Sequence, residues 1–302
     1  MPPFRLGTRG SPLALTQARM VADALAAAHG WSPDRIETVV IRTTGDRIQD
    51  RPLAEIGGKA LWTRELDRAL LAGEIDACVH SMKDVETLRP PDFLIAATLP
   101  RADVRDRLVG AESIEAIPRG ATVGTSSPRR RAQLLARRPD LRIVPIRGNV
   151  DTRLAKLAAG EVDATMLAAA GLDRLGRPEV GVAISTDIML PAPAQGAVGI
   201  EIRAEDARAA GVVSAIDHAD THRCVLAERA LLAALGADCH SPVAALASLI
   251  GASLHLRASL LSADGEEQAC GAAEGGNADL GAQLAADLLA RAPPAIRRLF
   301  AT

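Results

Sequence analysis

The chain reads Val123-Gly-Thr-Ser-Ser-Pro-Arg-Arg-Arg131 near its middle, where a short apolar run meets a hydroxyl-rich turn and the start of a helix. Ser127 suits an N-cap, and Pro128 is favoured at the first helical position. The same order of apolar run, polar loop and helical pattern recurs through most of the 302 residues. This alternation is typical of an α/β fold with largely parallel strands.

Periodicity predicts where the elements lie. Short strands are expected over residues 4–6, 38–43, 77–80, 94–98, 122–124, 142–146, 164–167 and 197–202. Helices are expected over 11–29, over about 59–71 with an end at Gly73, and from Ser127 onward. After Asp217 the pattern predicts a smaller α+β domain, with helices over about 221–235 and 278–291 and antiparallel strands over 254–261 and 267–272. Residues 99–107 and 191–195 look like crossings between domains, so a discontinuous first domain is expected.

Composition narrows the classes of protein that this chain can be. Its mass of 31.5 kDa exceeds that of one small domain. A net charge of -2 with 2% aromatic residues disfavours a nucleic-acid binder, and the apolar runs are too short to span a membrane. The four cysteines are widely spaced and the N-terminus shows no apolar signal segment. A cytoplasmic protein without a disulfide framework is therefore expected.

One candidate catalytic group follows a predicted strand in Ala77-Cys-Val-His-Ser-Met-Lys-Asp-Val85. Ser81, Lys83 and Asp84 emerge there together, and ligands of open α/β sheets bind outside the carboxyl ends of strands. Asp84 is predicted to hold a cationic or N–H-bearing species. The alternative is a surface ion pair of Lys83 and Asp84 that contributes little.

Several loops at strand ends and helix starts carry arginines. Thr125, Ser126 and Ser127 offer donors beside a helix N-terminus, while the guanidinium groups of Arg129 and Arg130 suit carboxylates. The alternative there is a capped helix with a solvated basic first turn. Arg147 and Arg153 flank a Gly-Asn turn, and Thr8-Arg9-Gly-Ser11 repeats the pattern. Together they predict a ligand with several carboxylates or phosphates.

Cys239 lies in the predicted turn Gly236-Ala-Asp-Cys-His-Ser-Pro242, where its thiol is accessible as a nucleophile. Buried thiols are expected instead at Cys78, Cys224 and Cys270. A less favoured alternative is a zinc site built from His218, His222, Cys224, Cys239 and His240. Gly57-Gly-Lys59 is no P-loop, because Leu53 and Ala60 stand where that motif needs Gly and Ser or Thr. No metal is expected.

These motifs together resemble the hydroxymethylbilane synthase family, also called the porphobilinogen deaminase family, of the tetrapyrrole pathway. The resemblance covers almost the whole chain and rests on these stretches in family order: Thr8-Arg-Gly-Ser-Pro-Leu-Ala-Leu15 with Gln17, Gly57-Gly-Lys59, His80-Ser-Met-Lys-Asp-Val85, Gly124-Thr-Ser-Ser-Pro-Arg-Arg130, Arg147-Gly-Asn-Val-Asp-Thr-Arg-Leu154, Gln195-Gly-Ala-Val-Gly-Ile-Glu201 and Cys239-His-Ser-Pro242. The chain departs from the usual family pattern at Glu55, Trp62, Glu86, Asp238 and His240.

The resemblance implies three domains, the first two similar to periplasmic binding proteins with a cleft between them. The α/β domain 1 would comprise residues 1–98 and 196–216, the α/β domain 2 residues 99–195, and the smaller α+β domain 3 residues 217–302. Family members are usually monomers, and a monomer is expected here.

The implied reaction joins four porphobilinogen molecules head to tail with loss of ammonia and releases hydroxymethylbilane. By the same resemblance, Cys239 would carry a dipyrromethane cofactor through a thioether, and Asp84 would be the catalytic residue. The groups that would bind the cofactor are Lys59, Ser81, Lys83, Asp84, Thr125, Ser126, Ser127, Arg129 and Arg130. Substrate would be bound by Arg9, Ser11, Gln17, Arg147, Arg153, Arg174 and Gln195. The rival function is a cytoplasmic two-lobed anion-binding or sensor protein without turnover.

Overall fold

A computed structural model describes residues 2–41, 63–276 and 279–300, which form two compact units. Unit 1 comprises Met1–Ala102 and Ala197–His222, and unit 2 comprises Asp103–Gly196 and Arg223–Thr302. Unit 2 thus includes the C-terminal part that was expected as a separate domain. The three-domain boundaries stay a prediction.

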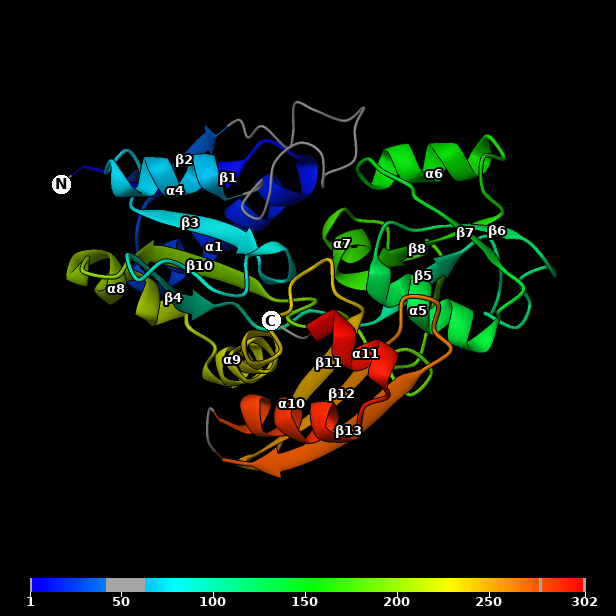
Figure 1. The fold of residues 1–302 in the computed structure, drawn as a ribbon. Coiled ribbons are helices and arrows are strands. Elements are labelled where there is room, and N and C mark those ends of the chain that lie inside the picture. Colours follow the sequence, from blue (N-terminus) through cyan, green and yellow to red (C-terminus); the bar gives the residue numbers. More distant parts are fainter. Residues whose placement is uncertain (1, 42–62, 277–278, 301–302) are drawn as a thin grey trace. The chain divides into compact units, whose positions relative to one another are not determined.

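Unit 1 is built on a five-stranded mixed sheet (Figure 1). Its strands, in the spatial order β2-β1-β3-β10-β4, are β2 (Ile36–Ile41), β1 (Phe4–Arg9), β3 (Ala77–Ser81), β10 (Val198–Arg203) and β4 (Phe93–Thr98). Strand β1 pairs in parallel with β2 and β3, whereas β10 runs antiparallel to both β3 and β4. The prediction of largely parallel strands is confirmed for this sheet, since β2, β1, β3 and β4 run in one direction. Strand β10 is the exception, because it re-enters unit 1 from unit 2 and needs no crossover helix to reach its neighbours.

Local sequence signals define the helices of unit 1. The long helix α1 (Pro12–His29) begins after Ser11, whose hydroxyl accepts a hydrogen bond from the Ala14 N–H at 3.3 Å, and ends at Gly30 with a φ of 63°. Its buried face packs on the sheet through Ala18, Val21 and Leu25. The shorter helices are α4 (Arg64–Leu71), α8 (Ala207–Val213), η1 (Pro33–Arg35), η2 (Met82–Asp84) and η3 (Ser214–Ile216).

Unit 2 contains a second five-stranded mixed sheet, in the order β7-β6-β8-β5-β9. The strands are β7 (Arg142–Val144), β6 (Thr122–Gly124), β8 (Ala164–Ala168), β5 (Asp106–Val109) and β9 (Val182–Ala183), and the helices are α5 (Pro128–Arg137), α6 (Val150–Ala158) and α7 (Ala169–Arg174). Strand β5 overlaps the stretch 99–107 that was expected as a crossing, so that expectation is wrong for its last two residues. The strand was not predicted because Asp106 and Arg107 are charged, and charged residues are not expected in a buried strand. Asp106 is nevertheless buried here, because Arg129 and Arg130 neutralise its charge.

The C-terminal part of unit 2 is an antiparallel three-stranded sheet packed on helices (Figure 1). Its strands are β11 (Val243–Ile250), β12 (Ser253–Leu261) and β13 (Gln268–Gly275), and its helices are α10 (Leu280–Arg291) and α11 (Pro294–Phe300), while α9 (Ala219–Ala234) begins in unit 1 and ends here. Leu231 of α9, Leu256 of β12 and Leu284 of α10 belong to one buried core. This confirms the α+β character, although β11 and α11 were not predicted.

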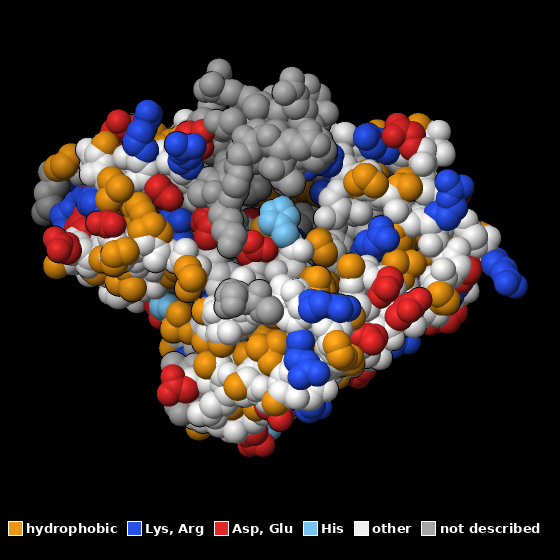
Figure 2. Space-filling view, viewed as in Figure 1, with side chains coloured by type: hydrophobic (Ala, Val, Ile, Leu, Met, Phe, Trp, Pro, Cys, Tyr) orange, Lys and Arg blue, Asp and Glu red, His pale blue; other side chains and the backbone are white. Residues whose placement is uncertain are grey.

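Two further observations concern the described helices and the charges on the surface. Among the described residues, no helix is both long and apolar enough to cross a bilayer. On the face in Figure 2, acidic and basic side chains of the described residues are interspersed and form no continuous basic stripe.

Candidate active site

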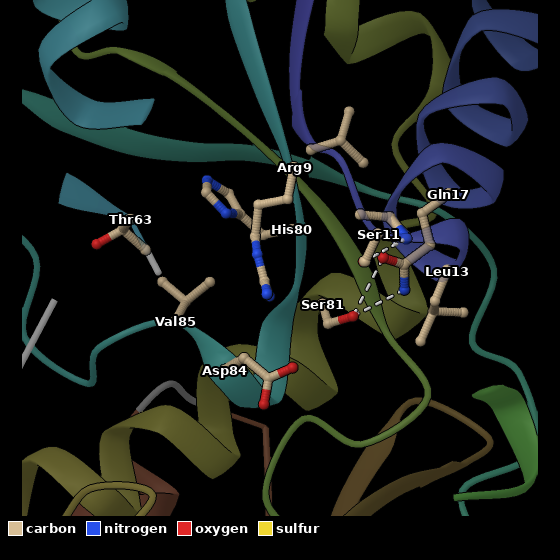
Figure 3. Close-up of a pocket in the computed structure, with 11 residues that line it drawn as sticks. Arg9, Ser11, Leu13, Gln17, Thr63, His80, Ser81, Asp84 and Val85 are labelled. Atoms are coloured by element: carbon tan, nitrogen blue, oxygen red, sulfur yellow. Dashed lines mark hydrogen bonds between the residues drawn. The ribbon is translucent and has the colours of Figure 1, made fainter. Parts of the chain in front are cut away.

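Asp84 lies at a pocket of unit 1, at the carboxyl ends of β1 and β3. The pocket is lined by polar groups that include Arg9, Ser11, Gln17, His80, Ser81 and Asp84. In Figure 3 the Arg9 side chain runs between His80 and Ser81 toward Asp84. Parallel β1 and β3, together with the start of α1, thus bring together residues that lie more than 60 positions apart in the sequence.

The Gln17 amide holds the Ser81 hydroxyl in this pocket (Figure 3). Nε2 of Gln17 lies 2.8 Å from Oγ of Ser81, and Oγ lies 3.1 Å from Oε1 of Gln17. Gln17 is buried, whereas Ser81 is half-buried and Asp84 is exposed. The hydroxyl therefore has a fixed orientation, while the Asp84 carboxylate remains accessible to a ligand.

A buried charge network, absent from the predicted site, adjoins His80. Its Nε2 lies 3.1 Å from Oε2 of Glu201, whose carboxylate also accepts hydrogen bonds from Arg89 at 2.8 and 3.0 Å. Arg89 further pairs with Asp67 at 2.6 Å and with Glu86 at 2.8 Å. Burial raises the pKa of Glu201, but the hydrogen bonds and charges of His80 and Arg89 outweigh it and lower the pKa to about 2. Glu201 is therefore a carboxylate at neutral pH.

In unit 2, the predicted hydroxyl groups lie at the start of α5. Ser127 is the N-cap, and its Oγ accepts a hydrogen bond from the Arg130 N–H at 3.4 Å. Oγ1 of Thr125 accepts from the Ser127 N–H at 3.2 Å, and the Ser126 hydroxyl donates to the Ile146 carbonyl at 2.8 Å. These hydroxyl groups therefore cap the start of α5 and hold the turn before it. Ser126 is exposed, and Thr125 is buried.

Arg129 and Arg130 turn into unit 2, where both guanidinium groups meet the carboxylate of Asp106. The N–O distances are 2.8 Å from Arg129 and 2.7 Å from Arg130, and the residues are 3% and 6% exposed. Burial raises the pKa of Asp106, but the two cations outweigh it and hold that pKa well below its usual range. Two arginines on one carboxylate leave a net positive charge. This fits a site for an anionic ligand, although a structural ion pair accounts for the same contacts.

Three of the other predicted substrate groups of unit 2 donate hydrogen bonds to its backbone. Nε of Arg153 donates to the Gly148 carbonyl at 3.0 Å, and Nη2 of Arg174 donates to the Gly196 carbonyl at 2.7 Å. Gln195, only 1% exposed, donates to Oδ1 of Asp106 at 2.9 Å and to the Val104 carbonyl at 2.8 Å. Arg147 is half-buried in the loop after β7. Gln195 thus supports the carboxylate that holds the arginine pair.

Cys239 is exposed in the turn between α9 and β11, as predicted. Oδ1 of Asp238 accepts from the His240 N–H at 2.9 Å, which orders that turn. Cys78 and Cys224 are buried as expected, but the expectation for Cys270 is wrong: it is exposed on the edge strand β13. Lys59 lies outside the described residues.

Two of the three histidines of the alternative zinc site have other partners. Nδ1 of His222 lies 3.0 Å from Oδ1 of Asp217, and Nδ1 of His218 lies 2.9 Å from the Thr221 hydroxyl. Within residues 2–41, 63–276 and 279–300, no cluster of three or more His, Cys, Asp or Glu side chains is arranged to hold a metal ion. The zinc alternative has no support in this part of the chain.

Two site residues that sequence reasoning missed carry recognisable signals. Asp106 is a lone acid in a strand, followed 23 residues later by the arginine pair. His80 stands inside the same motif as Asp84, and the period of a strand turns it to the face opposite Val79 and Ser81. Neither signal by itself identifies the partner side chain.

Comparison with known proteins gives two family models that together match most of the chain. "Porphobilinogen deaminase, dipyromethane cofactor binding domain" matches residues 4–211, and "Porphobilinogen deaminase, C-terminal domain" matches residues 222–290. A curated porphobilinogen deaminase of Sphingopyxis alaskensis is 58% identical over 99% of this chain and 97% of its own length. One from Paracoccus denitrificans is 54% identical over 96% of this chain and 95% of its own length.

Proposed function

The chain belongs to the porphobilinogen deaminase family, and from this membership we propose how its residues divide the work of the reaction. The enzyme is a transferase that joins four porphobilinogen molecules head to tail with loss of ammonia and releases hydroxymethylbilane. Its dipyrromethane cofactor supplies the primer to which the substrate units are added.

The residues of unit 2 fit that cofactor in two respects. Cys239 offers an exposed nucleophile in an ordered turn, as a thioether link requires. The pyrrole rings carry acetate and propionate arms, and the excess positive charge of Arg129 and Arg130 over Asp106 suits them. We assign Cys239 as the attachment residue. Thr125, Ser126 and Ser127 of unit 2, and Ser81 and Lys83 of unit 1, are assigned as further cofactor contacts.

Asp84 is assigned as the catalytic carboxylate, and its position carries this proposal. It is exposed at the mouth of a pocket whose other polar groups, Arg9, Ser11 and Gln17, suit the carboxylate arms of a substrate. Loss of ammonia leaves an electron-poor pyrrole unit, which a nearby carboxylate stabilises. The same carboxylate accepts hydrogen bonds from pyrrole N–H groups.

The other predicted substrate groups of unit 2 are assigned two different roles. Arg147, Arg153 and Arg174 would contact substrate or the growing chain. Gln195 is nearly inaccessible, so its hydrogen bonds to Asp106 and Val104 support a positioning role rather than direct substrate contact.

Intact mass spectrometry tests the attachment residue, because a thioether survives denaturation. Wild-type protein is expected to exceed the sequence mass by two linked pyrrole units, and Cys239→Ser is expected to show the sequence mass alone. Cys270→Ser is the matched control, since that thiol is also exposed. An excess mass that persists in Cys239→Ser contradicts the assignment.

Asp84→Asn tests the catalytic role. The variant is expected to fold and to keep its cofactor mass, while formation of hydroxymethylbilane falls by a factor on the order of a hundred or more. A turnover rate near that of wild type would remove Asp84 from the mechanism. The rival function, anion binding without turnover, predicts no product from either protein.

The working state is proposed to be a cytoplasmic monomer without nucleic-acid partners. Sedimentation of the holoenzyme at micromolar concentration tests the monomer, and a stable dimer would contradict it.

A further inference from the structure

His80 lines the pocket, and none of the roles above accounts for it. The residue lies at the carboxyl end of β3, four positions before Asp84, and lines the same pocket. In Figure 3 its ring lies across the pocket from Gln17 and Ser81, with the Arg9 side chain between them. His80 is only 6% exposed, so the rest of its ring is enclosed by protein.

The contact with Glu201 decides which ring nitrogen carries the hydrogen. Glu201 is ionised and fully buried, so its oxygens act only as acceptors. Nε2 of His80, 3.1 Å away, must therefore be the donor. In the neutral ring this leaves Nδ1 as a lone-pair acceptor. Among the described residues, no hydrogen-bond partner of Nδ1 is present.

The network behind Glu201 keeps this arrangement in place. Nε and Nη2 of Arg89 reach both Glu201 oxygens, and Arg89 is itself held by Asp67 and Glu86. A carboxylate fixed at both oxygens cannot swing away from His80. Such a buried group is costly unless its partners are complete, and here they are.

We propose that His80 binds the substrate through Nδ1, and that Glu201 is the positioning residue that aims it. This rests on the proposed function. Porphobilinogen presents one pyrrole N–H and one ammonium group as donors, whereas the pocket groups Arg9 and Gln17 supply donors. Asp84 is the one carboxylate among the described lining residues. In the neutral ring, Nδ1 of His80 supplies a further acceptor, so that Asp84 and His80 can each take one donor.

Two amide variants separate this role from a structural one. The side-chain oxygen of His80→Asn lies close to where Nδ1 stood but does not reach Glu201. The longer chain of His80→Gln reaches Glu201 but leaves the Nδ1 position empty. We expect kcat/KM for porphobilinogen to fall roughly ten- to a hundredfold in His80→Gln and by much less in His80→Asn, while thermal stability falls more in His80→Asn.

The control pair is His29→Asn and His29→Gln. His29 also engages a partner through Nε2, the Val212 carbonyl at 2.9 Å, but it lies at the end of α1 and does not line the pocket. Both control variants should keep wild-type kcat/KM. Equal losses in the two His80 variants, or full activity in His80→Gln, would overturn the proposal and leave His80 a structural residue.

A measurement on unaltered protein keeps the proposal testable if His80→Asn fails to fold. Nitrogen NMR of the holoenzyme with labelled histidine reports the tautomer, and the His80 signals are assigned by their loss in His80→Gln. Nε2 is expected to be protonated and Nδ1 bare at a pH where the ring is neutral, and the opposite tautomer would overturn the proposal. The tautomer does not depend on turnover, whereas wild-type enzyme that forms no hydroxymethylbilane would refute the proposed function itself.

Discussion

Replacing Asp106 with Asn removes the carboxylate that two buried arginines share. The side chain of Asp106 is 1% exposed, and Arg129 and Arg130 approach it at 2.8 and 2.7 Å. Breaking a buried ion pair on one side costs about 3–5 kcal/mol, because the partner charge stays buried without compensation. Asn keeps the shape and can still accept from Gln195, but it offers the guanidinium groups no charge. We therefore expect Asp106→Asn to destabilise unit 2 by about 3–5 kcal/mol.

The matched control is Asp187→Asn in the same unit. Asp187 pairs with Arg257 at 2.7 Å, the distance found between Arg130 and Asp106, but its side chain is 79% exposed. An exposed pair contributes about 0–1 kcal/mol, so the same substitution there should change little. The two variants make the same substitution at an ion pair of the same N–O distance, but Asp106 is buried and shared by two arginines, whereas Asp187 is exposed and pairs with Arg257.

Urea or thermal unfolding of both variants measures the difference. For a unit of this size, the Asp106→Asn loss corresponds to a fall in Tm of about 6–20 °C. The folded-state pKa of Asp106 is below the unfolded value of 3.8, so its stabilisation is complete above about pH 5 and is lost as pH falls below 4. The gap between wild type and Asp106→Asn should narrow in acid. Equal, small losses in the two variants would refute the burial argument.

Further predictions concern three other sites. Glu201 has a pKa of about 2 when folded and 4.5 as its ordinary value, so its ionised form stabilises the protein by about 3 kcal/mol above pH 5. This stability is lost as pH falls from about 4.5 toward 2, and a pH series of urea unfolding should show wild type approaching Glu201→Gln there. Burial raises the pKa of the Cys78 thiol well above its usual value, so alkylation of native protein should label Cys270 and spare Cys78, as peptide mass spectrometry would show. Gln17→Leu removes the amide that orients Ser81, and KM for porphobilinogen should rise roughly 3- to 20-fold with the fold intact.

Clear outcomes would contradict each of these. A constant difference between wild type and Glu201→Gln down to pH 2 would mean that folding does not lower the pKa of Glu201. Rapid labelling of Cys78 would mean that β3 opens readily. An unchanged KM in Gln17→Leu would show that the orientation of Ser81 does not matter for substrate binding.

Those parts of the fold that depend on neighbouring residues were predictable from the chain alone. Ser11 and Ser127 cap their helices, and Pro follows each of them, as the sequence pattern indicates. The strand Thr122–Gly124 was predicted with its observed bounds. The strands β5 and β11 were missed, because a charged or Ala-rich strand shows its character only through what packs on it.

The candidate site also has one part that the sequence predicts and another that only the structure shows. That Asp84 and Arg9 meet at one sheet edge follows from parallel strands and needs no coordinates. That Arg130 turns to Asp106, 24 residues earlier in the chain, does not follow. The sequence motif is the same whether the guanidinium of this arginine is solvated or paired with a buried acid. Only the folded unit decides between the two.

Sequence by itself determined the family, the α/β layers and the residue types that carry the chemistry. Each of these depends on the order of motifs along the chain and on the spacing of residues within them. Tertiary structure alone decided the antiparallel return of β10, the shared carboxylate of Asp106 and the orientation of His80 by Glu201. These depend on contacts between residues far apart in the chain. The physical reason is that burial sets both the cost of a charge and the strength of its partner, and burial is a property of the whole fold.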